Sequence, residues 1–221
     1  MDDRLLYWLS ILLYLLQPSQ YLKAIPLLLL GTSALNLPWT SPKYKTSEST
    51  FFIRVAFGCA GIGDFFLDND STVVIGTLLF CLTNLFLGVD FMLDNYYMHI
   101  CGKRPSNNWV IFGDVLTQPM LIVPSTVSVG LFWVCPSWML FFLFSTYSFC
   151  ISFALFQSLT LQNKPITKIS MVLFVISDLL VLLQFMKVHS RLDPAMARTL
   201  HYVDLFLYWS AMFGIRISCF S

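Results

Sequence analysis

Eight apolar runs of 13 to 26 residues occupy most of this sequence. Short segments rich in Pro, Asn, Asp and Ser separate the runs, and these residues favour turns because Pro lacks a backbone donor while Asn and Ser hydrogen-bond their own backbone. About 20 apolar residues are enough for a helix to cross a bilayer. The predicted spans are residues 4–16, 21–37, 51–67, 73–93, 109–134, 137–159, 166–187 and 200–220.

The composition agrees with a membrane protein. Hydrophobic residues make up 57% of the 221 residues and charged residues 11%, whereas a soluble domain has about 25% charged residues. Too little polar surface is available to face water, so the lipid bilayer is the expected solvent. We predict an all-α fold with a single domain, residues 1–221, that forms a polytopic transmembrane bundle of about eight helices. The N-terminus lacks the basic region of a signal peptide, so the first run is expected to be retained.

Several function classes find no support in the sequence. The net charge is +1 and no basic cluster is present, so nucleic acid is not an expected partner. The six cysteines are scattered without a Cys-x-x-Cys pair, and none of the three histidines lies deep in a predicted span, so no metal site is expected. Serine hydrolysis is unsupported because Gly-x-Ser-x-Gly is absent. The sequence leaves open whether the chain forms a homo-oligomer.

The basic residues predict which ends of the spans face the cytoplasm. Nine fall on one side of the eight-span topology and four on the other, and the positive-inside rule assigns the richer side, with both termini, to the cytoplasm. The cytoplasmic set is Arg4, Lys43, Lys45, Arg54, Lys103, Arg104, Lys164, Lys168 and Arg216. The exoplasmic set is Lys23, Lys187, Arg191 and Arg198.

Five aspartates fall within the predicted spans, and capping or pairing at the membrane interface explains the two near cytoplasmic span ends, Asp90 and Asp114. Asp178 is near the middle of the span 166–187, Asp64 is in the exoplasmic half of 51–67, and Asp204 is near the exoplasmic start of 200–220. A charged aspartate at the bilayer centre costs roughly 2.5–3.5 kcal/mol on insertion scales, so such residues face the bundle interior. Asp64 and Asp178 are the best candidates for a shared site, and the alternative is a pair of packing acids. Asp94, at a span end, is expected to be solvated.

The surroundings of Asp64 and Asp178 share two features. Gly58, Ala60, Gly61 and Gly63 are small enough to let neighbouring helices pack close to Asp64. Each acid follows a small residue and precedes two apolar ones, on the third span of each half of the chain. This match suggests a 4+4 parallel repeat.

The order and spacing of several motifs resemble the YhhN-like family of integral membrane proteins, which includes the animal lysoplasmalogenases. The motifs are LKAIPLLLL with Lys23 and Pro26, CAGIGDFFL with Gly63 and Asp64, GTLLF with Gly76 and Phe80, FVISDLL from Phe174 to Leu180, and LYWSAMFGI with Tyr208. The resemblance implies an eight-helix bundle that hydrolyses the vinyl ether of lysoplasmalogens to a fatty aldehyde and glycerophosphoethanolamine or glycerophosphocholine. It also implies that Asp64 and Asp178 carry catalysis, that no cofactor is needed, and that the protein resides in the endoplasmic reticulum or another endomembrane.

The sequence departs from the family pattern at three positions. Family members usually have a His and, three residues on, a Tyr in the fourth span, where this chain has Asn84 and Leu87. A Gln expected four residues after Tyr208 is replaced by Met212. An eight-helix bundle with buried aspartates also fits two alternatives, a lipid-binding pseudoenzyme and a proton-coupled transporter, and the replaced positions favour the pseudoenzyme.

Two buried carboxyl groups suit vinyl ether hydrolysis. Protonation of the vinyl carbon gives an oxocarbenium ion that water captures, so the reaction needs an acid that keeps its proton near neutral pH. Burial raises the pKa of a carboxyl group, and a second carboxylate nearby raises it further. A second negative group would stabilise the cation, as in glycosidases. We hypothesise that the deeper Asp178 is the general acid and Asp64 the base, and the reverse assignment stays open.

Four residues are candidates for substrate binding. Lys23 would hold the substrate phosphate as a point charge or extend to the membrane interface. Tyr208 would hydrogen-bond a carboxyl group or the glycerol, or serve packing alone. Ser177 would bond the neighbouring acid or its own helix carbonyl. Asn84 is a weaker candidate, as is Tyr147.

Overall fold

Helix accounts for nearly all of the chain that the computed structural model describes, which is residues 3–33, 47–67, 72–100, 124–132, 135, 137–161, 164–185 and 194–220. The helices are α1 (Asp3–Leu16), α2 (Gln20–Ser33), α3 (Ser47–Leu67), α4 (Val73–Ile100), α6 (Trp138–Thr160), α7 (Pro165–Phe185) and α8 (Pro194–Phe220). Residues 124–132 are also helical, and no strand occurs among the described residues. The predicted all-α fold is confirmed.

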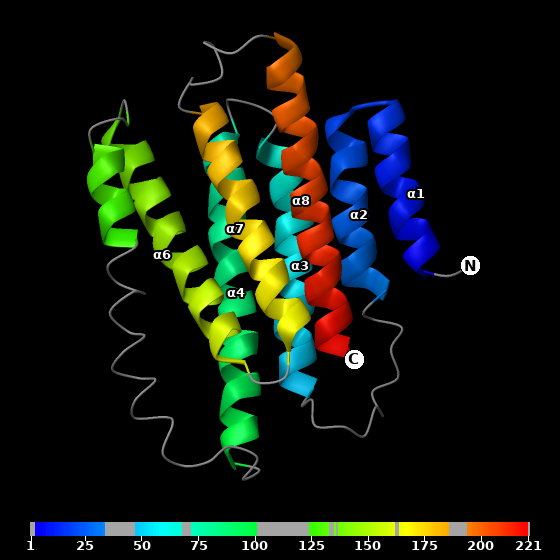
Figure 1. The fold of residues 1–221 in the computed structure, drawn as a ribbon, viewed down its shortest axis with the longest axis vertical. Coiled ribbons are helices and arrows are strands. Elements are labelled where there is room, and N and C mark those ends of the chain that lie inside the picture. The colour runs from blue at the N-terminus through cyan, green and yellow to red at the C-terminus, as the bar shows by residue number, and fades with distance from the viewer. Residues whose placement is uncertain are drawn as a thin grey trace.

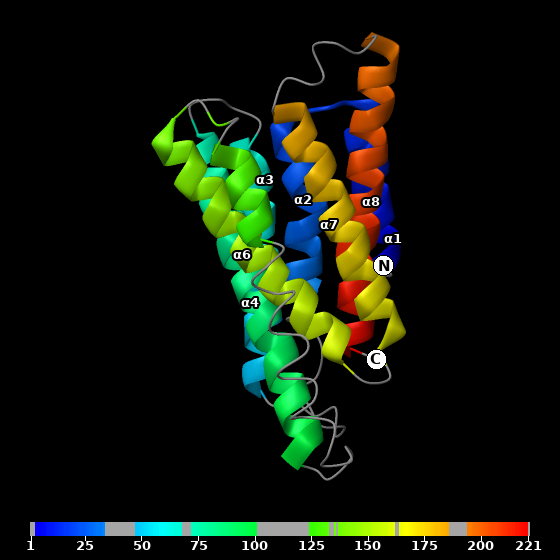
Figure 2. The ribbon, with the colours of Figure 1, turned by 60° about the vertical axis from the view of Figure 1, so that its left-hand side comes forward.

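The helices lie side by side in a bundle, with chain neighbours antiparallel (Figure 1). The α3 helix packs between α2 and α4, α7 packs on α8, and α2 also touches α8. The α6 helix packs on α4 and makes fewer contacts with α7. Figures 1 and 2 show that α6 and α7 are close where their chain segments join and diverge towards the upper end. Both termini lie at the lower ends of their helices (Figure 1).

Most helix ends fall where the turn-forming residues predict them. The α1 helix ends at Leu16, before Gln-Pro-Ser, and α3 ends at Leu67. Ser137 caps the N-terminus of α6, its hydroxyl accepting a hydrogen bond from the backbone N–H of Leu140. The α8 helix begins at Pro194, six residues before the predicted span, because Pro fits the first helical turn, where its missing N–H is not needed. Most of the predicted span 109–134 lies outside the described residues.

The α4 helix continues seven residues beyond its predicted end at residue 93. Polar contacts accompany the extension, because Lys164, just before α7, forms an ion pair with Asp94 at 2.6 Å. Asn95 donates to the hydroxyl of Thr160 at the end of α6. The prediction that Asp94 is merely solvated was wrong, since its side chain is largely buried and paired.

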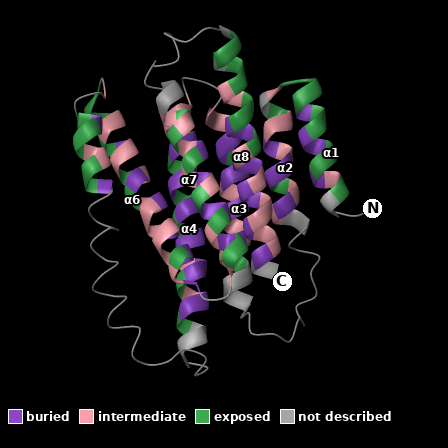
Figure 3. Cartoon of the chain, viewed as in Figure 1, coloured by how far each residue is buried: buried purple, intermediate pink, exposed green. Residues whose placement is uncertain are grey.

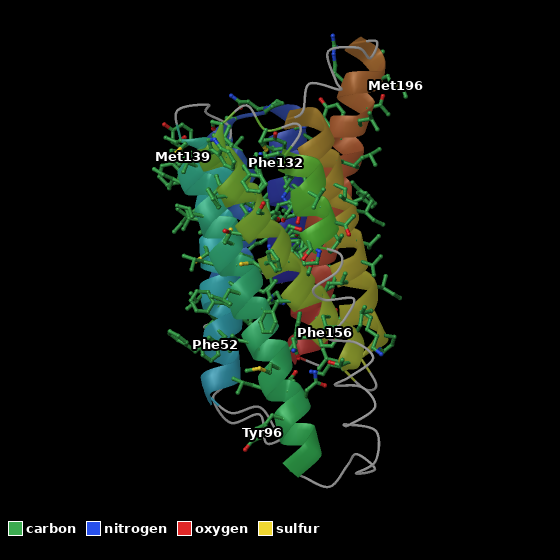
Figure 4. The ribbon with its side chains drawn as sticks, turned by 90° about the vertical axis from the view of Figure 1, so that its left-hand side faces the viewer. Phe52, Tyr96, Phe132, Met139, Phe156 and Met196 are labelled. Carbon is green, nitrogen blue, oxygen red and sulfur yellow. The ribbon has the colours of Figure 1, made fainter. Side chains whose placement is uncertain are left out.

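The outer surface of the bundle is apolar. Three described helical segments, Val73–Tyr96, Trp138–Thr160 and Pro165–Leu182, are long and apolar enough to cross a membrane, and Leu5–Leu16 and Tyr21–Gly31 are shorter apolar helices. Phe52, Tyr96 and Met139 lie on the outside of the bundle in Figure 4. The chain is an all-α membrane bundle, while the count of eight spans and their sidedness stay predictions.

Buried residues occur on every described long helix and are most numerous on α3, α4 and α8 (Figure 3). Glycines allow the helices to approach. A Cβ atom at Gly63 would lie 2.9 Å from the Phe80 ring of α4, and one at Gly61 would lie 3.0 Å from Leu28 of α2. Gly58 has no neighbour within 4 Å of a Cβ position, so close packing explains Gly61 and Gly63 but not Gly58.

Candidate functional site

A cavity of about 530 Å³ lies inside the upper half of the bundle. It is placed where α3 ends, α4 and α8 begin, and α6 diverges from α7. We call it the acid cavity, because Asp64, Asp178 and Asp204 all line it. Its other lining residues are Lys23, Leu67, Val73, Thr77, Phe80, Val127, Leu131, Phe144, Tyr147, Ser148, Ile151, Ser152, Leu155, Val175, Ser177, Leu179, Val181, Leu182, His201, Leu205 and Tyr208.

The FVISDLL motif forms one face of α7. Residues three and four positions apart lie on the same side of a helix, so Phe174, Ser177 and Asp178 point in a common direction. Phe174 is fully buried and stacks on Tyr208 of α8, with ring centroids 5.8 Å apart. Asp178 and Ser177 line the acid cavity. The motif thus places one acid, one hydroxyl and one ring that supports a neighbouring tyrosine.

Asp64 on α3 is 2% exposed and receives a hydrogen bond from the hydroxyl of Tyr208 at 3.1 Å. The Tyr208 ring is held by Phe174 and by Phe80 of α4, whose ring centroid is 6.0 Å away. Rings on both α4 and α7 therefore fix the direction of the phenol. Gly63 contributes as well, because it lets Phe80 lie next to the chain that carries Asp64.

Asp178 is bound by a second tyrosine. The hydroxyl of Tyr147 on α6 donates to Asp178 Oδ2 at 2.5 Å. Asn84 on α4 is fully buried, donates to the Phe80 carbonyl, and lies close enough to interact with Tyr147. Asp178 is also near enough to Asp64 and Asp204 for the three carboxyl groups to interact electrostatically.

Asp204 on α8 is the third acid. It is 5% exposed, and the hydroxyl of Ser177 donates to its Oδ1 at 2.6 Å. Lys23, near the start of α2, interacts electrostatically with Asp204. His201 lies one helical turn before Asp204 and lines the same cavity. We call the part of the acid cavity that is lined by Lys23, His201 and Asp204 its polar end.

Five of the six predicted site residues line the acid cavity, namely Asp64, Asp178, Lys23, Tyr208 and Ser177. The sixth, Asn84, does not line it but lies next to two residues that do, Phe80 and Tyr147. Tyr208 binds a carboxyl group, as one prediction had it, whereas Ser177 binds neither Asp178 nor its own helix carbonyl but Asp204.

Sequence reasoning left Asp204 and His201 out of the site. The signal that could have found them is the spacing of His201, Asp204 and Tyr208, which are three and four residues apart and so share one face of α8. Because Asp204 lies near a predicted span end, the sequence favoured the deeper Asp178 as the partner of Asp64.

The lining of the acid cavity is unevenly polar. Its acids, Lys23 and His201 come from α2, α3, α7 and α8. Residues 124–132 contribute the apolar Val127 and Leu131, and α6 contributes three apolar residues, such as Ile151, and three that carry a hydroxyl group. Among the described residues, no group of three or more His, Cys, Asp or Glu side chains is arranged to hold a metal ion. The arrangement suits a small amphiphile, because ligand sites of about 300–1,000 Å³ are mostly apolar with a few converging polar groups.

Comparison with known proteins gives one match. The family model described as the YhhN family matches residues 19–219, which includes all the acids of the cavity. No curated protein and no solved structure matches the chain.

Proposed function

This chain belongs to the YhhN family, and on that basis we propose that it is a membrane hydrolase that cleaves the vinyl ether bond of lysoplasmalogens. The products are a fatty aldehyde and glycerophosphoethanolamine or glycerophosphocholine. The observation that carries the proposal is the pair Asp64 and Asp178, which come from α3 and α7, line one cavity, and each accept a hydrogen bond from a tyrosine.

The reaction begins with transfer of a proton from a carboxyl group to the vinyl carbon that does not bear the oxygen. The carbon–carbon double bond supplies the electron pair, and the adjacent carbon and ether oxygen become an oxocarbenium ion. Water adds to that carbon and releases a proton, which gives a hemiacetal. The hemiacetal collapses to the aldehyde and the free glycerol hydroxyl, so one water molecule is consumed and the protons balance.

Asp178 is assigned as the acid and Asp64 as its partner. Two carboxyl groups that share an apolar site do not both ionise readily, so one of them can retain the proton that the first step consumes. The other supports the positive charge and accepts a proton from the attacking water, as a carboxyl pair does in glycosidases. Tyr147 and Tyr208 hold one oxygen of each acid and so fix the direction of the other.

The polarity of the acid cavity suits a lysophospholipid. Lys23 provides a positive charge for the phosphate at the polar end. The hydrocarbon chain would lie along Val127, Leu131 and Ile151. In this orientation the vinyl ether, which joins the chain to the glycerol, lies at the boundary between the two regions, next to the acids.

The test is aldehyde release from a lysoplasmalogen by purified protein in detergent. Wild-type protein should release aldehyde, while Asp64→Asn and Asp178→Asn should each lose roughly 10²–10⁴-fold in rate, the usual contribution of a general acid or base. In D₂O the aldehyde should carry one deuteron on the carbon next to the carbonyl, because that carbon receives the proton. The saturated ether analogue should not react.

Normal hydrolysis by both Asp→Asn variants would reject the acid pair. Binding of the saturated analogue without turnover of the vinyl ether by wild-type protein would instead favour the lipid-binding pseudoenzyme. The Asn84, Leu87 and Met212 positions give that alternative its support. Substrate-dependent proton movement across liposomes, without hydrolysis, would favour a transporter.

A further inference from the structure

The acid cavity contains one acid more than vinyl ether hydrolysis uses. Asp64 and Asp178 are sufficient for proton transfer, yet Asp204 is about as enclosed as Asp64 and lines the same space. A carboxyl group buried in an apolar bundle is costly, so its presence calls for a role in structure or in binding. Ser177 holds Oδ1 of Asp204 and so fixes the direction of the carboxyl group.

Asp204 differs from Asp178 in its charged neighbours. The charged groups that act on Asp178 are Asp204 and Asp64, both of them acids. Asp204, in contrast, is close enough to Lys23 to interact with it electrostatically. A positive and a negative side chain thus lie near each other at the polar end of the cavity. A zwitterionic head group carries the complementary pair, a phosphate for Lys23 and an ammonium for Asp204.

We propose that Asp204, held by Ser177, is the specificity-determining residue that binds the ammonium group of the lipid head group, with a preference for the primary amine of ethanolamine over the quaternary amine of choline. This inference rests on the proposed function for the identity of the lipid. A primary ammonium has three N–H donors for a carboxylate, whereas a quaternary ammonium has none.

The surroundings of Asp204 support this preference. Proteins recognise quaternary ammonium groups with open aromatic faces. Tyr208, one turn from Asp204, already stacks on Phe174 and packs against Phe80, so its ring is engaged with other side chains. The other α8 residues that line the cavity within about one turn of Asp204 are His201, the aliphatic Leu205 and Tyr208, and the Ser177 hydroxyl of α7 bonds to Asp204.

Binding can be measured apart from catalysis with saturated 1-O-hexadecyl lysolipids that carry phosphoethanolamine, phosphocholine or phosphoglycerol. Wild-type protein should bind the phosphoethanolamine lipid most tightly. Asp204→Asn should raise its Kd by roughly 10- to 100-fold, the value of a hydrogen bond between charged groups, and leave the phosphoglycerol lipid almost unchanged. Ser177→Ala should act in the same direction with a smaller factor. Lys23→Met should weaken binding of all three lipids, because all carry the phosphate.

Asp94→Asn is the matched control. Asp94 is a largely buried acid that pairs with Lys164, and it lies 14 residues beyond Phe80 on α4, which puts it about 21 Å along the helix axis from that cavity-lining residue. It should alter thermal stability without altering the ranking of the three head groups. Each variant should elute as wild type on size exclusion in detergent.

A wild-type protein that binds the three head groups equally would overturn the inference. An Asp204→Asn variant that weakens all three by the same factor would also overturn it, because Asp204 would then act only by positioning Lys23. Unchanged Kd values with a uniform fall in kcat would make Asp204 a third reacting acid instead. Aldehyde release tests the proposed function, and the Kd values of the three head groups test this subsite. A protein that releases no aldehyde but loses its head-group preference in Asp204→Asn therefore rejects the first proposal and supports the second.

Discussion

Two tyrosines determine how the candidate catalytic acids are presented. Tyr147 and Tyr208 come from different helices, α6 and α8, and each donates to a single carboxyl oxygen. A carboxyl group that donates a proton to carbon must be correctly oriented. A hydrogen bond to one carboxyl oxygen fixes this orientation and leaves the second oxygen free to face the substrate. The tyrosines are therefore positioning residues, and removing one hydroxyl should affect the rate more than the fold.

Tyr147→Phe should lower kcat for vinyl ether hydrolysis by roughly 10- to 100-fold, because it removes a strong hydrogen bond to Asp178. The KM should change little, since the hydroxyl does not bind the head group in this arrangement. Tyr202→Phe, at an exposed position on α8, is the control and should behave as wild type. Equal losses in both variants, or a loss confined to KM, would contradict the positioning role.

The positions where this chain departs from the family pattern, Asn84, Leu87 and Met212, are all buried. Leu87 and Met212 are both 0% exposed and belong to the hydrophobic core, so the space that polar groups would fill is packed with apolar atoms. Asn84 keeps a polar group beside Tyr147 but leaves its Oδ1 without a donor among the described residues. Fewer polar groups thus surround the acid pair than the resemblance stated in the sequence analysis leads one to expect.

At the scale of elements, close contact between α3 and α4 places the Phe80 ring against α3 at Gly63, next to Asp64. Gly63 and Gly76 allow this contact, since a Cβ atom at Gly76 would lie 2.9 Å from the Leu67 side chain and 3.0 Å from its backbone nitrogen. Small residues at helix contacts are the usual means of close packing in membranes. The end of α3 and the start of α4 then contribute Leu67 and Val73 to the lining of the acid cavity.

Gly76→Ala should separate α3 from α4 and destabilise the protein by about 1–3 kcal/mol, the usual cost of overpacking. The thermal midpoint in detergent should fall, and activity should fall with it because Asp64 is displaced. Gly58→Ala is the matched control, since its Cβ position has no neighbour within 4 Å. Its midpoint should stay the same or rise slightly, because Ala favours helix over Gly by up to about 1 kcal/mol. The same fall in both variants would argue against the contact.

At the scale of the whole molecule, the acid cavity exists because elements far apart in the chain meet around it. Lys23 from α2 and His201 from α8 line its polar end, while Val127 and Leu131 line its apolar side. Neither the size of this space nor its uneven polarity is a property of any one helix. Under the proposed function, the hydrocarbon chain of the substrate lies against this apolar side.

Val127→Trp should fill part of the apolar side and slow the hydrolysis of long-chain lysoplasmalogens more than that of short-chain ones. Val129→Trp, two residues away and at a position that is 63% exposed, should leave the chain-length profile unchanged. Rates measured across a series of chain lengths distinguish the two. A uniform loss over all lengths in Val127→Trp would mean that this side of the cavity does not hold the chain.

Local patterns along the chain were enough to predict the all-α membrane class and most helix ends. They also identified Asp64 and Asp178 as acids within spans that face the bundle interior. Apolar runs, turn residues and the cost of intramembrane charge each act within a short stretch of sequence, so one sequence carries their signal. Lys23 and Tyr208 became candidates through the motifs of the family resemblance, and Ser177 through its place beside Asp178.

Which groups meet is a property of the packed bundle. Tyr147 binds Asp178, Ser177 binds Asp204, and Lys164 pairs with Asp94, which the sequence had placed in solvent. These pairings depend on the rotation and register of each helix. Side-chain packing between helices sets both, and it leaves no periodic signal in a single sequence.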